Sequence, residues 1–175
     1  MSKRIAKAVF AVLFSALLPS LWGAAEAAPP RKAAVFPFEV PDVIEQGEFL
    51  PKPSKEGPKI ALATEELRKL LAASGRYEVI DLSALATEIK AAQPLHKCNG
   101  CEVDLAKKAG ADVLVVGLVE KASDVLLNMT IEIRDVASGK VERVGSIVVQ
   151  GNTDDMWLRS VRWLCKNRLL SEETR

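Results

Sequence analysis

The chain has 175 residues, of which 49% are hydrophobic, 27% charged and 5% aromatic, and its formal net charge is +1. This composition excludes collagen, coiled-coil and disordered chains, and the length is that of one average domain. Because no basic stripe or acidic tail accompanies the near-neutral charge, the sequence also argues against nucleic-acid binding.

Residues 1–27 have the pattern of a secretory signal peptide. The positive charges of Lys3, Arg4 and Lys7 precede an apolar run over 8–18, and small residues with an A-x-A site follow. The run is shorter than the ~20 residues of a membrane-spanning helix. We expect cleavage after Ala27 and a periplasmic mature protein without stable membrane insertion. No cysteine lies near the cleavage site, so we expect no lipid attachment there.

After a leader at 28–32, we expect a single domain over 33–170 and a tail at 171–175. The apolar segment 33–40 predicts a strand, and Pro37 within it predicts an edge position or a bulge. Residues 41–58 are rich in proline and predict a long, extended and mobile connection.

Three helices are expected in the middle of the chain, with one short strand between the first two. Apolar residues recur at helical spacing from Ile60 to Leu71, with Glu65 opposite Lys69 and a stop at Gly75. A strand is predicted over 77–81. Ser83 is expected to cap a second helix that carries Leu85 and Ile89 and ends at Pro94. The third helix is predicted over 101–109, closed by Gly110.

The last third of the chain predicts three strands and a helix. Residues 113–119 are continuously apolar, which is typical of a central strand covered on both faces. Strict alternation over 127–134 predicts a strand with one wet face, and 141–149 is its expected hairpin partner. Asn152 to Asp155 predict the cap of a final helix that reaches about Leu170, and capping accounts for the adjacent carboxylates of Asp154 and Asp155 without catalysis.

A helical wheel of the final helix gives two apolar faces. The core face is expected to hold Trp157, Leu158, Val161, Leu164, Cys165 and Leu169. The opposite stripe holds Met156, Trp163 and Leu170, flanked by the basic residues Arg159, Arg162 and Lys166. Exposed Trp and Met beside Arg is a composition typical of protein–protein hot spots, so we predict that these six residues bind a partner. The alternative is that a chain end or the 41–58 loop covers Trp163.

The order of elements predicts one α/β domain with a mixed β-sheet packed with helices. Three segments, AVFPFE at 34–39, GADVLVVG at 110–117 and IRDVASGK at 133–140, resemble envelope domains related to the TolB N-terminal domain, CsgG and the periplasmic activators of penicillin-binding proteins. The resemblance extends over about 33–165, and YEVID at 77–81 is similar to the second strand of that fold.

The cysteine pair before Glu102 and the segment 151–154 are further similar to a proteobacterial family of secreted proteins without assigned function. The resemblance implies a non-enzymatic accessory or adaptor protein that docks onto another envelope protein, without a cofactor or catalytic residues. It also implies an association with a periplasmic quinoprotein dehydrogenase system. Neither a lipidation cysteine nor the membrane-spanning hairpins of CsgG are matched, so pore formation is not implied.

Cys98 and Cys101 allow three interpretations. A structural disulfide is favoured in an oxidising compartment, while their position before a predicted helix allows thiol-redox chemistry as the alternative. Metal or solute binding is the third. His96 and a distant Cys165 complete four candidate metal ligands, although the spacing fits no familiar zinc framework, and for a solute the sequence offers the 41–58 loop and His96. On its own, Cys165 is expected to be a buried apolar residue, and a disulfide between two chains is its minor alternative. With a single histidine and no G-x-S-x-G motif, the sequence predicts no hydrolase site.

Overall fold

Five strands form one mixed sheet in the computed structural model, which describes residues 28–41 and 55–171. In chain order the elements are β1 Arg31–Val35, α1 Gly57–Ala73, β2 Tyr77–Val79, η1 Ser83–Leu85, α2 Ala86–Ala92, η2 Leu95–Lys97, α3 Cys101–Lys108, β3 Val113–Ser123, β4 Leu126–Asp135, β5 Val141–Gln150, α4 Asp154–Leu164 and η3 Cys165–Leu169. The predicted signal peptide, most of the 41–58 connection and most of the predicted tail lie outside the described residues.

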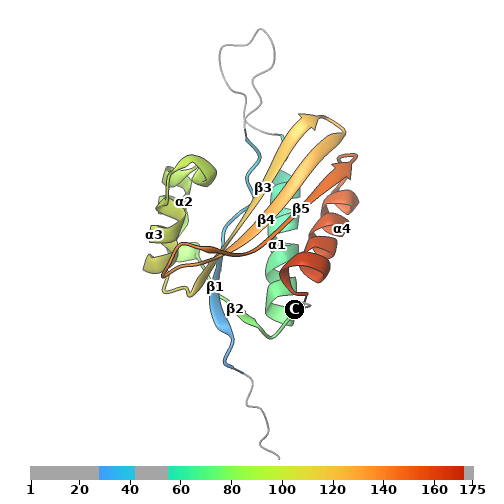
Figure 1. Cartoon of the computed structure of the whole chain (residues 1–175). Coiled ribbons are helices and arrows are strands. Elements are labelled where there is room, and N and C mark those ends of the chain that lie inside the picture. The colour runs from blue at the N-terminus through green and yellow to red at the C-terminus, as the bar shows by residue number, and fades with distance from the viewer. Residues whose placement is uncertain (1–27, 42–54, 172–175) are drawn as a thin grey trace, which may run out of the picture.

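The strand order is β2-β1-β3-β4-β5, with β1 parallel to β2 and β3, and β4 antiparallel to both β3 and β5. The prediction of a central strand is confirmed, because β3 is the middle strand of the five. Its continuous apolar sequence follows from helices on both sides of the sheet: α2 and α3 lie on one side, and α1 and α4 on the other (Figure 1). The predicted single α/β domain is therefore confirmed.

Two hydrophobic clusters lie on the two sides of the sheet. The larger one joins the sheet to α1 and α4 and contains Trp157, Val161 and Leu164 of α4. The smaller one joins β1 and β3 to α2 and α3. β1 contributes alternate side chains to both, with Ala33 and Val35 in the first and Ala34 in the second.

The prediction for the first strand needs a correction, because β1 ends at Val35 and lies between two strands rather than at an edge. Pro37 interrupts the strand, and the chain returns to the sheet only at Glu39, which forms an isolated parallel bridge with Leu118 of β3. In the interruption, the amide of Phe38 donates to Thr64 Oγ1 of α1 (3.0 Å). A side chain at position 117 would collide with the Phe38 ring, so glycine is needed there.

The first helix begins earlier than predicted. α1 starts at Gly57 with Pro58 in its first turn, a position that tolerates proline because the missing N–H has no partner inside the helix. The predicted stop is confirmed, since Gly75 has φ +69°. Glu65, expected opposite Lys69, forms its ion pair with Arg68 (2.6 Å).

Two local predictions in the middle of the chain need correction, the end of the second strand and the cap of the second helix. The second strand ends at Val79, and Ser83 does not cap a helix with its side chain. Asp81 organises this turn instead: its carboxylate accepts from the amide of Ser83 (2.9 Å) and from the Ser83 hydroxyl (2.6 Å). The third helix, the alternating strand β4 and the hairpin to β5 are confirmed.

The final helix begins as predicted. Thr153 caps it, with Oγ1 accepting from the amide of Met156 (3.3 Å). Its last residues differ from the expected helix because η3 is a π-helical turn. Among the described residues, no helix is long and apolar enough to cross a membrane.

Candidate functional site

The structure separates the three apolar residues that the helical wheel grouped. Trp163 is 41% exposed, and the guanidinium of Arg168 lies over its ring, 5.6 Å from the centroid. Met156 and Leu170 are half-buried and pack against the larger core cluster. The predicted continuous exposed stripe is therefore wrong, and Trp163 is its one strongly exposed member. Leu158 of the predicted core face is only half-buried, whereas Ser160 is buried.

Two local features explain the difference from the helical wheel. The π-helical turn, in which the amide of Leu170 donates to the carbonyl of Cys165 (2.9 Å), changes the angular spacing and brings Leu170 toward the core. At the other end, the side chain of Met156 packs closely on Gly151, where a Cβ atom would collide with it.

The basic residues predicted beside Trp163 are all exposed. Arg159 pairs with Asp155 on its own helix, and Arg162 Nε donates to Glu66 Oε1 of α1 (2.6 Å). We define the Trp163 surface as Trp163 with the cations Arg159, Arg162, Lys166 and Arg168. It combines one exposed aromatic ring with four positive charges, two of which are paired with the carboxylates of Asp155 and Glu66.

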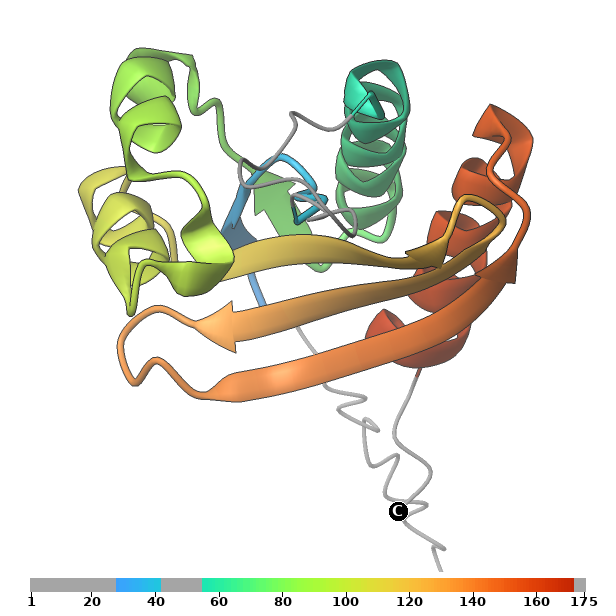
Figure 2. The same cartoon turned by 90° about the horizontal axis from the view of Figure 1, so that it is seen from above.

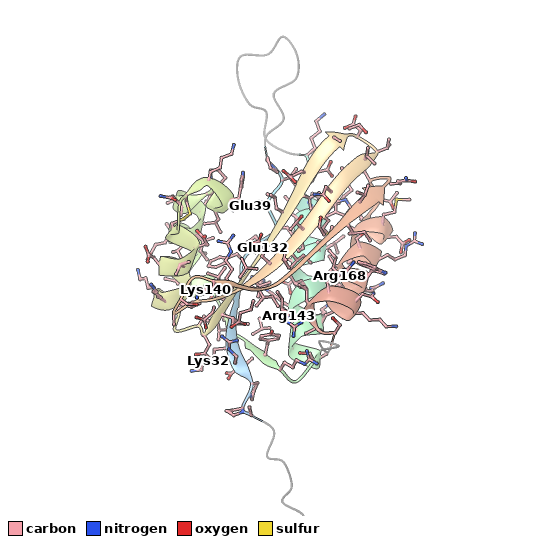
Figure 3. All side chains as sticks on the ribbon, in the orientation of Figure 1. Lys32, Glu39, Glu132, Lys140, Arg143 and Arg168 are labelled. Carbon is pink, nitrogen blue, oxygen red and sulfur yellow. A yellow bond between two sulfur atoms is a disulfide. The ribbon has the colours of Figure 1, made fainter. Side chains whose placement is uncertain are left out.

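A second feature, which the sequence did not reveal, is a cavity of about 560 Å³ between the sheet and the η2–α3 segment. Its apolar walls come from residues such as Leu95, Val103 and Val116, and its polar walls from the side chains described next. Figure 3 shows Glu39 and Glu132 on the side of the sheet that faces α2 and α3. Among the residues that line this cavity, the sequence singled out His96 as a candidate ligand. The others come from segments far apart in the chain, so no local pattern groups them.

Glu39 holds the rim of this cavity together. Its two carboxylate oxygens accept from the backbone amides of Leu95 (2.7 Å) and His96 (3.0 Å), and His96 Nδ1 lies 2.7 Å from Oε2. The backbone of Glu39 meanwhile pairs with β3, through its amide to Gly117 and its carbonyl to Val119. One residue thus fixes η2 relative to the sheet.

Arg134 of β4 links the sheet to α3 on the opposite wall. Its Nε and Nη2 donate to Glu132 Oε2 (2.9 and 2.6 Å), and its Nη1 donates to Glu102 Oε1 (3.1 Å). With Glu39, the cavity carries three carboxylates against one guanidinium and one imidazole. The lining therefore favours positively charged groups.

The sulfurs of Cys98 and Cys101 are at disulfide distance, with their Cα atoms 5.5 Å apart. The residues between them take the tight conformation that a four-residue loop requires: Asn99 and Gly100 have φ +56° and +107°. Cys98 Sγ lies 3.3 Å from Glu102 Oε2, and a carboxylate beside the sulfur opposes a thiolate. This arrangement favours a structural pair, although Cys101 does begin α3.

The predicted four-ligand set does not assemble. Ligand atoms of Cys98, Cys101 and Glu102 lie within 4.8 Å of one another, but His96 is engaged by Glu39. Cys165 is buried in the larger cluster, on the other side of the sheet. Burial, assisted by the charge of Glu66, raises the pKa of Cys165 to about 12, so this thiol is neither a ready ligand nor a nucleophile.

Residues 31–169 match a family described as "Protein of unknown function (DUF2380)". No curated protein matches the chain. Among solved structures, the chain is similar to the LpoB C-terminal domain from Escherichia coli, with 16% identity over 72% of this chain and 87% of that one (TM-score 0.49). It is also similar to the PelC dodecamer from Paraburkholderia phytofirmans, with 17% identity over 79% and 88% (TM-score 0.48). For TolB from Acinetobacter baumannii the values are 13% over 78% and 28% (TM-score 0.43).

Proposed function

We propose that this chain, which belongs to the family described as "Protein of unknown function (DUF2380)", is a non-enzymatic accessory protein that docks onto another envelope protein. The observation that carries the proposal is the Trp163 surface. A tryptophan left 41% exposed on a helix whose opposite face packs into the core through Trp157, Val161 and Leu164 is available to a partner. The predicted signal peptide supports the envelope location.

The chemistry of this surface defines the kind of partner. Tryptophan and arginine are the residues most enriched in interface hot spots, because each combines a large apolar area with directional polar contacts. Arg168 already lies over the Trp163 ring, which limits the conformational freedom that binding would remove. Lys166 adds a positive charge. We therefore propose a partner with an acidic surface and an apolar recess that takes the indole.

The experiment compares two variants that remove similarly exposed apolar side chains. Trp163→Ala removes the proposed anchor, and Leu62→Ala removes a leucine that is 40% exposed on α1. The mature protein with a C-terminal affinity tag is used to capture cross-linked partners from native envelopes, and each captured protein is then purified for a direct binding measurement. We expect Trp163→Ala to weaken binding at least ~10-fold, as for a hot-spot residue, and Leu62→Ala to leave it unchanged.

Stability measurements separate docking from folding. Trp163→Ala is expected to change the free energy of unfolding little, whereas Val161→Ala, a truncation in the core, is expected to lower it and to leave binding intact. A loss of ~3–5 kcal/mol in Trp163→Ala, typical of a buried aromatic residue, would place Trp163 in the core and overturn the proposal. Equal binding by Trp163→Ala and wild type would overturn it as well.

The cavity favours a second candidate function, the binding of a small positively charged solute. Its support is the volume of the cavity, its apolar walls, and the excess of carboxylates over cationic groups in its lining. Calorimetric titration with putrescine and with arginine tests this role. Binding that is lost in Glu39→Gln and kept in the exposed control Glu120→Gln would support it, and the absence of heat with both probes would refute it.

A thiol-redox role for Cys98 and Cys101 is the remaining alternative, and the reduction potential of the pair decides it. Structural disulfides have potentials below about −300 mV, and catalytic pairs lie well above this value. Because of the carboxylate beside Cys98, we expect the structural value.

A further inference from the structure

We propose that β5 pairs with β5 of a second copy of this chain, so that the two sheets join across a two-fold axis at Ser146. The inference rests on the edge of the sheet and goes beyond the proposed docking function. It uses residues other than those of the Trp163 surface, so either proposal can fail without the other.

β5 is a long, unprotected edge strand. Of the two edges of the sheet, β2 has three residues and β5 has ten. Figure 2 shows β5 along the front of the sheet, with no described helix or strand beyond it. Natural edges are usually blunted by lysine, proline or short length. β5 contains neither lysine nor proline, and its charged residues, Glu142 and Arg143, are confined to its first three positions, where its register with β4 also shifts. From Val144 onward the strand is regular and uncharged.

The outer face of β5 carries two exposed valines. Val144 is 53% exposed and Val148 is 62% exposed, and Ser146 lies between them on the same face. The other face is occupied: Val149 is buried, and Gly145 faces Leu164 and Arg168 so closely that a Cβ atom would collide with Arg168. A second strand beside β5 would therefore extend the sheet while leaving the packing of α4 unchanged.

The spacing of these residues selects one register. Antiparallel pairing must keep the α4 faces of both copies on the same side, so an outward residue must face an outward residue. With Ser146 opposite its own copy, Val144 of each chain faces Val148 of the other. Shifting the axis to Gly145 places Val144 opposite Ser146 instead. The first register matches apolar with apolar and polar with polar, as favourable cross-strand pairs require.

This self-complementarity is the reason for choosing a second copy over a strand of another protein. A two-fold axis needs one surface that complements itself, and a valine–serine–valine pattern centred on the axis satisfies this condition. The register also brings no like charges directly opposite each other, because Arg143 faces Val149.

The first test is the oligomeric state of the mature chain, measured by sedimentation at increasing protein concentration. We expect a reversible dimer. Val148→Lys places a lysine opposite Val144 and is expected to raise the dissociation constant at least ~10-fold. Leu62→Lys, which introduces the same charge at an exposed apolar position on α1, is expected to have no effect. A chain that stays monomeric at the highest concentration overturns the proposal, and so does equal weakening by both variants.

Cross-linking then tests the register and does not depend on whether Val148→Lys folds. Ser146→Cys is expected to form a disulfide-linked dimer with itself under mild oxidation. Thr130→Cys, which lies beside position 146 but one strand inward on β4, is the control and is expected to stay unlinked. A dimer in which Ser146→Cys fails to link while Val144→Cys or Val148→Cys links with itself would refute the register.

Discussion

The free energy of unfolding is expected to depend on a buried carboxylate at the start of α1. Glu56 is 5% exposed and joins three parts of the chain. Its Oε2 accepts from Lys59 of α1 (2.8 Å), and its Oε1 accepts from Lys121 of β3 (3.1 Å) and from Asn152 before α4 (2.9 Å). Asn152 in turn accepts from the indole N–H of Trp157 (2.9 Å). Replacing Glu56 by glutamine removes the charge but keeps the shape.

The magnitude follows from the titration of this group. Burial acts to raise the pKa of Glu56, but hydrogen bonds from Lys59, Asn152 and Lys121, with the lysine charge, outweigh it and lower the pKa from 4.5 to about 2. Because the folded-state pKa lies below the unfolded one, the ionised carboxylate stabilises the fold above pH 4.5, and this contribution is lost between pH 4.5 and 2. At about 1.4 kcal/mol per pH unit, it amounts to about 3 kcal/mol.

Chemical denaturation of the wild type and of Glu56→Gln at pH 7, 4 and 2 measures this contribution. We expect Glu56→Gln to lower the free energy of unfolding by about 2–3 kcal/mol at pH 7, with the difference closing as the pH falls to 2. Glu65→Gln, which removes an exposed glutamate paired with Arg68, is the control and is expected to change it by less than about 1 kcal/mol. A difference from wild type that stays constant across this pH range would refute the reasoning, because it would not come from the ionised state.

Three further outcomes are expected. Gly117→Ala should lower the free energy of unfolding by about 1–3 kcal/mol through overpacking against Phe38, whereas Gly57→Ala, with open space around it, should be near neutral in the same denaturation assay. Cys165 should resist alkylation at pH 8 in the folded protein and react at the rate of unfolding, because its thiol is buried and has a pKa of about 12; rapid labelling would contradict this. N-terminal sequencing of the exported protein should begin at Ala28, and a longer chain would show that the predicted cleavage site is wrong.

The sequence predicted elements whose signals are local. Apolar and polar residues alternate in β4 because one face of the strand is buried and the other is partly exposed, so the type of each residue indicates its face. Gly75 and Thr153 mark helix ends through backbone conformation and a hydrogen bond three residues away. Pro37 indicated an edge position or a bulge; the strand is indeed interrupted there, but it does not lie at an edge, because the sequence of one strand contains no information on its neighbours.

The candidate sites depended on contacts that no local pattern contains. The cavity combines Glu39 with residues that come more than fifty positions later, such as His96 and Arg134. The exposure of Trp163 was predicted, but the position of Leu170 required knowledge of a π-helical turn that a regular wheel does not include. Trp157 was assigned to the core without its partner Asn152, since the bond forms only when the chain turns before α4.

The contacts of Arg31 have a consequence for export. Its guanidinium binds Glu142 (2.7 and 2.8 Å), 111 residues later, and Asp135 (2.9 Å). β1 also needs β3 as its parallel neighbour, and such distant pairing makes folding slow. During synthesis, β1 can pair with β2, but its other side has no strand until β3 has emerged, and Arg31 has no carboxylate partner until Asp135 and Glu142 follow. The predicted secretion signal at the N-terminus would be recognised while the sheet behind it is still incomplete.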